Sequence, residues 1–355
     1  MSSNRDLLYF VGSVPLKDSE DVFRQLSREV GPYLRRIPDG ETGERGKWIV
    51  FQQRMLQEHP AMEIDPSLPP LPVNQSDGTV LREIRRVRLK LDADPESVEF
   101  DTGYDRAALS AYDTFRRLRG GGTIPAGVRF QFALPTPMAT GLMYVSPNGR
   151  DRYLYAYERA ILKALNNILA GIPHDELSIQ FDVCQDVLLF ENYFPERAPD
   201  YKETVFRQFG RLSVAVPERV ELGFHLCYGS PGDQPLIRLR DAGVLVELMN
   251  GIDASAERNV DFIHIPVPRQ ADDAFFSPLR QWRRPAETRL YLGLLQYNDP
   301  VGNQTRIAAA RRFVSDFGVG AECGFGRTDP NRVPGLLAGH RAAAELLAST
   351  VRGAT

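Results

Sequence analysis

The sequence has too few cysteines and too few long apolar runs to fit several large classes of protein. Only three cysteines occur in 355 residues, Cys184, Cys227 and Cys323, so a fully paired disulfide framework is excluded and reduced thiols are expected. No stretch approaches the roughly 18 apolar residues of a membrane span. The opening MSSNRDLLYFVGS also lacks the charged start and long apolar run of a secretory signal. We therefore expect a cytoplasmic protein with no membrane partner.

A strong excess of charge is also missing. Lysine and arginine total 43 against 46 acidic residues, which gives a formal net charge of −3. This balance gives no reason to expect nucleic acid as a partner. The most basic run, REIRRVRLK at 82–90, is interpreted as a solvated face. Contact with an anionic donor is the alternative if this run folds over the active site.

What the sequence does contain is a regular alternation of short apolar runs and amphipathic stretches. The apolar runs are typical of strands buried on both faces, and they span 7–15, 128–135, 177–183, 220–228, 260–268, 290–296 and 317–326. Helical spacing of apolar residues marks 152–170, 200–215, 235–251, 304–316 and 334–351. The alternation predicts an α/β fold, either a (β/α)8 barrel of the TIM type or a doubly wound sheet.

The barrel is favoured because polar residues collect where successive predicted strands end. These residues are Ser13, Asp182, His225, Cys227, His264 and Cys323. Barrel enzymes carry their sites on that carboxyl-terminal rim. We see no internal repeat and no linker, so a single barrel domain over 1–355 is expected.

Residues 57–125 break the alternation. A proline-rich stretch is followed by VRLKLDADPESVEF, which is interpreted as a short hairpin, and by a predicted helix in YDRAALSAYDTFRRL. Long loops in compact domains are usually functional or disordered. We interpret this segment as an insertion after the first strand that covers the active site.

The pair His225-x-Cys227 lies at the end of a predicted strand. Residues i and i+2 of a strand point to the same side, so both side chains can reach one ion, and zinc accepts imidazole nitrogen and thiolate sulfur. Cys323 lies at the end of the last predicted strand and can face the same opening. A packed core histidine beside a small apolar cysteine is the alternative. Cys184, after the Asp182 strand, is interpreted as a packing residue that faces away from Asp182.

Several short motifs resemble the catalytic barrel of the cobalamin-independent methionine synthase family. HLCYG and ECGFGR resemble its zinc motifs, VGSVP its I-G-S-F-P, DGETGER its H-G-E-x-E-R, and IQFDV its I-Q-I-D-E. They occur in the family's order from residue 11 onward. The resemblance implies zinc on His225, Cys227 and Cys323, and an amino-thiol substrate held by Ser13, Glu41 and Asp182. It also implies zinc activation of a homocysteine-like thiol.

The sequence departs from the family at the fourth zinc ligand, a glutamate on the following strand. Pro266 occupies that position in VDFIHIPVP, and His264 is the candidate replacement. Glu247 in VLVELMN is a weaker candidate because helical spacing around it indicates a helix. A three-ligand site completed by water or by the substrate thiolate is the third possibility.

Further departures concern the methyl donor. Val183 replaces a substrate-binding glutamate, FALPTPMA lacks the family's folate-binding tryptophan, and the amino-terminal barrel of the family has no counterpart. These differences argue against folate and leave another methyl or alkyl donor open.

The function expected from all these features is zinc-dependent methyl or alkyl transfer to a thiol. The partners would be a small thiol or amino acid and an alkyl donor. The alternatives are a zinc-dependent lyase or hydrolase acting on a sulfur compound, and a diverged barrel that binds an amino acid or thiol without turnover. A uroporphyrinogen decarboxylase-like barrel, which needs no metal, ranks below these because it does not explain the histidine and cysteines.

Overall fold

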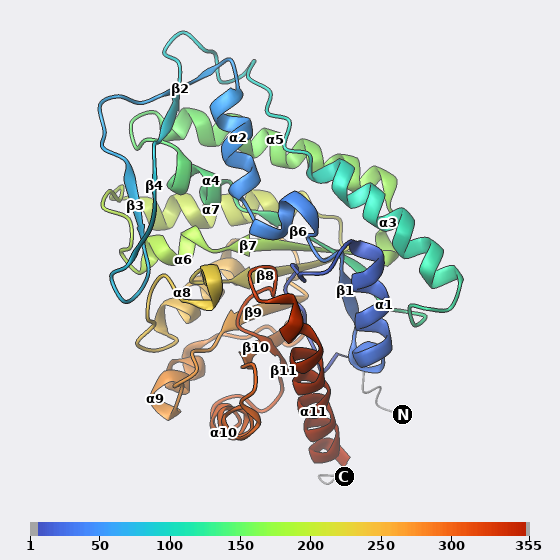
Figure 1. The fold of residues 1–355 in the computed structure, drawn as a ribbon. Coiled ribbons are helices and arrows are strands. Elements are labelled where there is room, and N and C mark those ends of the chain that lie inside the picture. Colours follow the sequence, from blue (N-terminus) through green and yellow to red (C-terminus); the bar gives the residue numbers. More distant parts are fainter. Residues whose placement is uncertain (1–5, 353–355) are drawn as a thin grey trace.

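The computed structural model of the protein describes residues 6–352 and contains a curled sheet of seven parallel strands (Figure 1). In spatial order the strands are β1 (Arg36–Pro38), β6 (Arg129–Pro135), β7 (Leu177–Val183), β8 (Glu221–Leu226), β9 (Phe262–Pro266), β10 (Arg289–Leu295) and β11 (Gly318–Ala321). Every residue of β7, β8 and β9 is buried, as expected for strands covered on both faces. The curled parallel sheet is consistent with a TIM-like barrel.

The amino-terminal segment lies between the two edges of this sheet. Leu8 forms parallel bridges with Leu34, just before β1, and with Val319 of β11. The Tyr9 amide donates to the Val319 carbonyl at 2.9 Å, and the Val319 amide donates to the Leu7 carbonyl at 2.9 Å. The predicted strand over 7–15 is therefore reduced to a bridge at Leu8, and the chain joins both sheet edges there.

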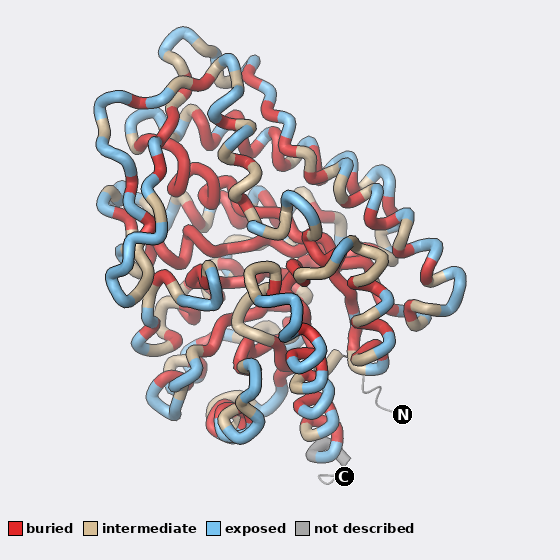
Figure 2. The backbone as a smooth tube through the Cα atoms, in the orientation of Figure 1, coloured by how far each residue is buried: buried red, intermediate tan, exposed pale blue. Residues whose placement is uncertain are grey.

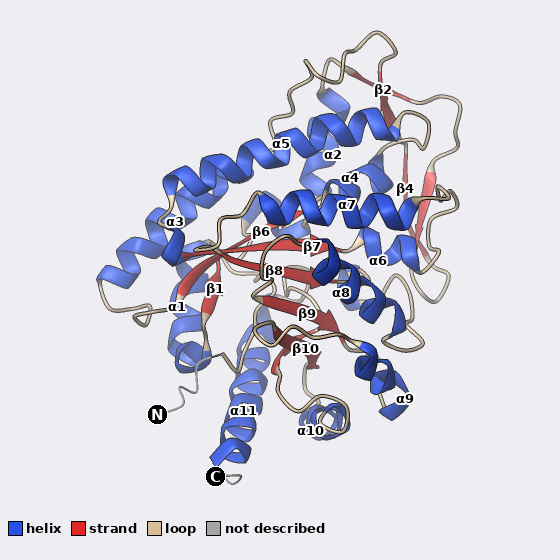
Figure 3. Ribbon diagram, turned by 180° about the vertical axis from the view of Figure 1, so that it is seen from behind, coloured by secondary structure: helices blue, strands red, loops and turns tan. Residues whose placement is uncertain are grey.

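Helices surround the sheet on its outer side (Figures 1 and 3). They are α1 (Ser19–Val30), α2 (Val50–Glu58), α3 (Tyr104–Gly120), α4 (Pro137–Tyr144), α5 (Arg150–Gly171), α6 (Gln185–Phe190), α7 (Tyr201–Val214), α8 (Gly243–Ser255), α9 (Asp273–Phe276), α10 (Pro300–Ala310) and α11 (Val333–Arg352). The last helix, α11, packs against α1, so the two ends of the described chain are neighbours. Within residues 6–352, no helix combines the length and apolar character needed to cross a bilayer.

Most predicted elements are confirmed, with shifts at their ends. The helix expected over 235–251 begins only at Gly243, and the last strand ends at Ala321 rather than at 326. The short strand β1 and the helix α1 were not predicted. Three residues that include Pro38 provide too little apolar pattern to mark a strand. The helix α1 does carry a local signal, because its buried residues Val22, Phe23, Leu26 and Val30 repeat at helical spacing.

The segment 57–125 forms two small antiparallel sheets and one long helix. Strand β2 (Met62–Ile64) pairs with β5 (Val87–Leu89), and β3 (Leu71–Asn74) pairs with β4 (Val80–Ile84). The hairpin expected within 87–100 is wrong, because β5 pairs backward with β2 instead of with its own continuation. The predicted extended loop contains β2 and β3. The helix α3 is confirmed.

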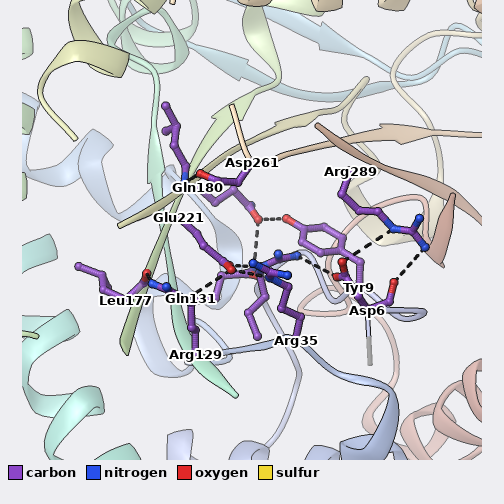
Figure 4. Close-up of polar contacts among 12 residues, drawn as sticks. Asp6, Tyr9, Arg35, Arg129, Gln131, Leu177, Gln180, Glu221, Asp261 and Arg289 are labelled. Carbon is purple, nitrogen blue, oxygen red and sulfur yellow. Dashed lines mark hydrogen bonds and ion pairs between the residues drawn. The ribbon is translucent and has the colours of Figure 1, made fainter. Parts of the chain in front are cut away.

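The interior is dense, and buried residues are concentrated in the strands and on the inward sides of the helices (Figure 2). At the amino-terminal ends of the strands the interior holds a network of charges (Figure 4). Glu221 pairs there with Arg36 at 2.9 Å, with Arg35, and with Arg129 at 3.4 Å. Burial acts to raise the pKa of Glu221, but Arg36 and Arg35 outweigh it and hold that pKa below its ordinary value. This end of the sheet is closed by paired groups.

Candidate metal and substrate site

Polar side chains meet at the opposite, carboxyl-terminal ends of the strands. Asp182 of β7 is the register partner of His225 on β8, and His225 is the register partner of His264 on β9. Neighbouring positions on parallel strands turn their side chains to the same face, so the three residues form one row. The strand pattern that placed polar residues at the ends of apolar runs therefore found a real cluster.

Three of the predicted ligands converge in this cluster. Ligand atoms of His225, Cys227 and Cys323 all lie within 4.8 Å of one another. Cys227 follows the end of β8, and its amide donates to the Val183 carbonyl at 3.1 Å, which continues the strand-like pairing by one residue. Cys323 lies just after β11 and reaches the same point from the far edge of the sheet.

The donor set fits zinc. The two sulfur atoms of Cys227 and Cys323 are 3.5 Å apart, close to the ~3.8 Å that two thiolates span around a tetrahedral zinc with Zn–S bonds of about 2.3 Å. His225 Nε2 is buried and has no hydrogen-bond partner among the described residues. An unpartnered nitrogen that lies beside two thiols is free to bind an ion held by their sulfur atoms. Two close thiols and one free imidazole nitrogen form a three-ligand set.

His264 orients the ring of His225 but is not one of the three converging ligands. His225 Nδ1 and His264 Nδ1 are 2.8 Å apart, so the two rings share a hydrogen bond on the side of His225 away from Nε2. Metal-binding histidines usually have their second nitrogen fixed in this way. His264 is fully buried, and burial followed by the nearby His225 lowers its pKa well below the ordinary value. It lies outside the group of converging ligands.

Glu247 lies elsewhere. It is on α8, partly exposed, and its carboxylate forms an ion pair with Lys202. The predicted helix that made Glu247 a weaker ligand candidate is present, although it begins at Gly243 and not at residue 235.

The thiols of Cys227 and Cys323 lie close to each other, and the thiol of Cys184 lies beside that of Cys227. The neighbouring Cys184 thiol, together with burial, raises the pKa of Cys227 well above its ordinary value. The Cys227 thiol and burial do the same to the pKa of Cys323. Metal ligation requires the thiolate forms, so an ion bound by both sulfur atoms would have to displace both protons.

The interpretation of Cys184 as a residue facing away from Asp182 is wrong. The two residues are two positions apart, and extended backbone turns such positions to the same side. Cys184 is buried and lines the same cavity as Cys227. Gly229 lies next to both cysteines. Its amide donates to the Cys227 sulfur at 3.2 Å, and a Cβ at this position would lie 3.7 Å from the Cys184 sulfur.

Ser13 holds the loop that carries Cys323. Its hydroxyl accepts a hydrogen bond from the Gly326 amide at 3.1 Å, and its carbonyl accepts one from the Phe325 amide at 2.6 Å. A Cβ at Gly324 would lie 2.3 Å from the Ser13 Oγ, so this close approach requires glycine in ECGFG. Arg327, from the same loop, donates to the Cys323 sulfur at 3.3 Å. The two predicted motifs VGSVP and ECGFGR are thus in direct contact.

Glu41 and Asp182 form a pair of buried carboxyls beside the cluster. Burial, reinforced by Asp182, raises the pKa of Glu41 to about 8, and burial raises the pKa of Asp182 to about 7. Two hydrogen bonds stabilise the ionised form of Asp182, one from Trp48 Nε1 at 2.9 Å and one from Gln180 Nε2 at 2.6 Å. A Cβ at Gly12 would lie 2.7 Å from Glu41 Oε1, which explains the glycine before Ser13.

The loop bearing Glu41 is held in an unusual backbone conformation. Glu41 has φ of 45° and Trp48 has φ of 54°, both in the left-handed region. Such conformations cost non-glycine residues about 1–3 kcal/mol and cluster at functional sites. Trp48 and Gln180 were not identified from the sequence. Trp48 lies three residues after the DGETGER motif and belongs to no motif of its own.

These groups line a cavity of about 430 Å³. Its lining includes the predicted residues Ser13, Glu41, Asp182, His225, Cys227 and Cys323, together with the missed residues Trp48 and Cys184. Apolar residues also line it, namely Ile49, Val50, Val73, Leu81, Met143 and Leu236, and so do the charged or amide side chains of Lys47, Arg82, Gln185 and Arg327. The cavity therefore combines acidic, basic and apolar surfaces.

Comparison with known proteins supports the fold. No protein-family model matches the sequence, and no curated protein sequence matches it. Among solved structures, a putative vitamin-B12 independent methionine synthase from Listeria monocytogenes aligns with a TM-score of 0.59 and 14% identity, over 96% of this chain and 98% of that one. A B12-independent methionine synthase from Shewanella sp. W3-18-1, in complex with selenomethionine, aligns with a TM-score of 0.56 and 13% identity, over 97% and 98% of the two chains. The protein thus shares its fold with structures of the cobalamin-independent methionine synthase type.

Proposed function

We propose that the protein is a zinc-dependent enzyme that transfers a methyl or alkyl group to the thiol of a small amino acid. The observation that carries the proposal is the convergence of His225, Cys227 and Cys323 within one cavity that also contains two buried carboxyls. The shared fold with methionine synthase structures supports the same reaction class.

In this proposal His225 Nε2 and the sulfur atoms of Cys227 and Cys323 hold the ion. Three protein ligands leave one position open, as in catalytic zinc sites. When bound, zinc lowers the pKa of a coordinated substrate thiol, so that the nucleophilic thiolate is available at neutral pH. The hydrogen bond between the Nδ1 atoms of His264 and His225 fixes the His225 ring and leaves its Nε2 available to bind the ion.

Glu41 and Asp182 are proposed to bind the substrate ammonium group. Their raised pKa values mean that at least one of the pair keeps its proton near neutral pH, and an ammonium group would replace that proton. Trp48 and Gln180 hold Asp182 in place. The selenomethionine in the Shewanella structure indicates that a barrel of this fold accepts an amino acid of this size.

We propose that the chain acts as a single barrel domain and that the segment 57–125 covers its active site. Val73 of β3 and Leu81 and Arg82 of β4 line the cavity, which supports this role. A donor other than folate is proposed, because FALPTPMA lacks the tryptophan that helps to hold folate in the family. Because three free thiols need reducing conditions, a cytoplasmic location is proposed as well.

The first experiment is metal analysis by plasma mass spectrometry on protein purified without a metal-affinity tag. Wild type is expected to contain about one zinc per chain, and the double variant Cys227→Ser/Cys323→Ser is expected to contain none. Cys184→Ser is the matched control, because it replaces a buried cysteine of the same cavity that lies outside the converging ligands.

The chemical test is thiol alkylation by the zinc-loaded protein. Homocysteine and related amino-thiols are incubated with methyl donors, and the alkylated product is measured by mass spectrometry. Folded wild type that contains no zinc and takes up none would overturn the proposal. Zinc-loaded protein that cleaves a thioether without alkylating any thiol would favour the lyase or hydrolase alternative.

A further inference from the structure

We propose that Arg82 is the anchor for an anionic group on the second ligand of this cavity, an amphipathic molecule whose apolar part lies against the wall formed by Val73, Leu81 and Met143. The anion-binding site stands on its own observations, and only the description of its ligand as the alkyl donor rests on the proposed function. Arg82 belongs to the basic run 82–90, for which the sequence predicts a solvated face or, alternatively, contact with an anion.

The hairpin that carries Arg82 is fixed to the carboxyl-terminal end of the sheet. The Ser76 amide, at its turn, donates to the Pro235 carbonyl at 3.0 Å, in the loop that follows Cys227. The Asn74 amide donates to the Tyr193 hydroxyl at 2.8 Å, and that hydroxyl donates back to the Asn74 carbonyl at 2.9 Å. Arg82 and its register partner Val73 therefore have a defined place in the cavity wall.

Arg82 differs from the other arginines of its run that are held by contacts. Arg86 forms an ion pair with Glu196 at 3.1 Å, and Arg88 pairs with Glu63 at 2.9 Å. Among the described residues no carboxylate lies within ion-pair distance of Arg82, and this sets it apart from Arg86 and Arg88. Its Nε, like that of Arg86, is buried without a hydrogen-bond partner. A buried guanidinium donor without an acceptor is costly unless a ligand supplies one.

The two buried carboxyls of the cavity, Glu41 and Asp182, do not pair with the guanidinium of Arg82. The arginines that act on Glu41 and Asp182 are Arg45 and Arg327. Arg82 instead lies beside the buried Tyr144 hydroxyl and is its nearest charged group. Burial raises the pKa of that phenol, and the nearby Arg82 acts in the opposite direction. An oxyanion at this point would meet two donor groups, a guanidinium and a phenol.

The class of ligand follows from the surroundings of Arg82. The wall around it is apolar, so the ligand needs an alkyl portion to gain from burial. The guanidinium fork suits the planar or tetrahedral oxygens of a carboxylate, sulfonate or phosphate. We therefore expect an alkyl chain that ends in one of these anions.

The test uses straight-chain alkyl carboxylates, sulfonates and phosphates of four to eight carbons, with the primary alcohols of equal length as uncharged controls. Binding is followed by fluorescence of Trp48, which lines the cavity, in a Trp282→Phe background, because the sequence contains only two tryptophans. Comparison of the three anion series identifies which head group is preferred.

In wild type the anions are expected to bind more tightly than the alcohols. Arg82→Gln should weaken the anions by about tenfold or more while leaving the alcohols nearly unchanged, because it removes a charge-assisted hydrogen bond. Arg82→Lys should restore part of the difference. Arg85→Gln, an exposed arginine of the same run, is the matched control and should bind like wild type.

Equal binding of anions and alcohols to wild type, or equal binding of anions to wild type and Arg82→Gln, would overturn the inference. Thermal unfolding of each variant shows whether the fold is kept, and Arg82→Lys provides the second comparison if Arg82→Gln is unstable. Zinc content is measured in the same samples. An anion preference that depends on Arg82 in protein without zinc would leave this site standing while the proposed function fails.

Discussion

Buried polar groups lie at both ends of the curled sheet, but they are paired at one end and partly unpaired at the other. At the amino-terminal ends of the strands, Glu221 lies among three arginines, and Arg36 also donates to the Tyr291 hydroxyl at 2.9 Å (Figure 4). At the carboxyl-terminal ends, His225 Nε2 has no hydrogen-bond partner among the described residues, and burial together with Asp182 raises the pKa of Glu41 to about 8.

This difference separates polar groups that support the fold from those available to ligands. A satisfied buried network lowers the free energy of the folded state relative to a broken one, whereas unsatisfied buried groups cost free energy. Such a cost is tolerated where a ligand completes the interactions. We therefore expect substitutions at the amino-terminal end to affect unfolding, and substitutions at the carboxyl-terminal end to affect metal and substrate binding.

The largest expected effect is at Glu221. Glu221→Gln leaves the buried charge of Arg36 without its partner, and removal of one member of a buried ion pair typically costs about 3–5 kcal/mol. Urea unfolding at pH 7 measures this loss, and zinc content per folded chain should stay unchanged. The control is Arg106→Gln, which breaks the exposed pair with Asp101 and should cost less than about 1 kcal/mol. Equal effects of the two variants would remove the distinction between the two ends.

The next effect concerns His264. His264→Gln removes the ring that orients His225, and loss of such supporting contacts usually weakens metal affinity by about 10–100-fold. Competition with a chromogenic chelator measures the zinc affinity. His340→Gln is a matched control, because His340 is also buried but hydrogen-bonds to the Leu336 carbonyl. If His264→Gln abolishes zinc binding entirely, His264 is itself a ligand.

The pair of carboxyls should make amino-acid binding depend on pH. Burial first, and Asp182 second, raise the pKa of Glu41 to about 8, so its proton is held below that pH and must leave before an ammonium group can bind. Affinity for methionine, which has no thiol proton, should therefore rise from pH 6 to pH 8, by at most about tenfold per unit. Calorimetry across this range on protein of known metal content measures it. Glu41→Gln should flatten the profile, and an unchanged profile in this variant would exclude Glu41.

The smallest expected effect is at Trp48. Trp48→Phe removes the hydrogen bond to Asp182, worth about 1.5–3 kcal/mol to a charged acceptor at most, and water in the open cavity can replace part of it. The pKa of Asp182 should rise further, and methionine affinity at pH 7 should fall several-fold, as measured in the same titration. Trp282→Phe, whose tryptophan instead donates to Asp253, is the control. A loss of zinc in Trp48→Phe would contradict the assignment of Trp48 to the substrate side.

Much of the fold and part of the site follow from local sequence. The strands β6 to β10 were predicted because each is a run of apolar residues buried on both faces, and α5, α7 and α11 because their apolar residues repeat at helical spacing. His225 and Cys227 could be paired because strand geometry turns positions i and i+2 to one side. Ser13, Glu41 and Asp182 were found by resemblance, and they do line the cavity.

Other features have no local signal. The strand β1 is three residues long and holds its place by pairing with β6, which lies about ninety residues later. Trp48 contacts Asp182 only after segments 134 residues apart are brought together, whereas Gln180 lies two positions from Asp182 on the same strand. Arg82 and Arg86 stand in the same basic run, and only the position of Glu196 in space separates a paired arginine from an unpaired one.

By itself the sequence determined the class of fold, the order of most elements and the identity of the residues with metal-binding chemistry, because side-chain type and periodicity are local properties. The tertiary structure decided which of these residues meet. The thiol of Cys323 lies beside that of Cys227, although the two residues are 96 positions apart in the sequence. His264 contacts His225 and is not one of the three converging ligands, and Cys184 lines the same cavity. Distances between segments far apart in the chain depend on how the strands close into a sheet, and no short pattern of residues contains that information.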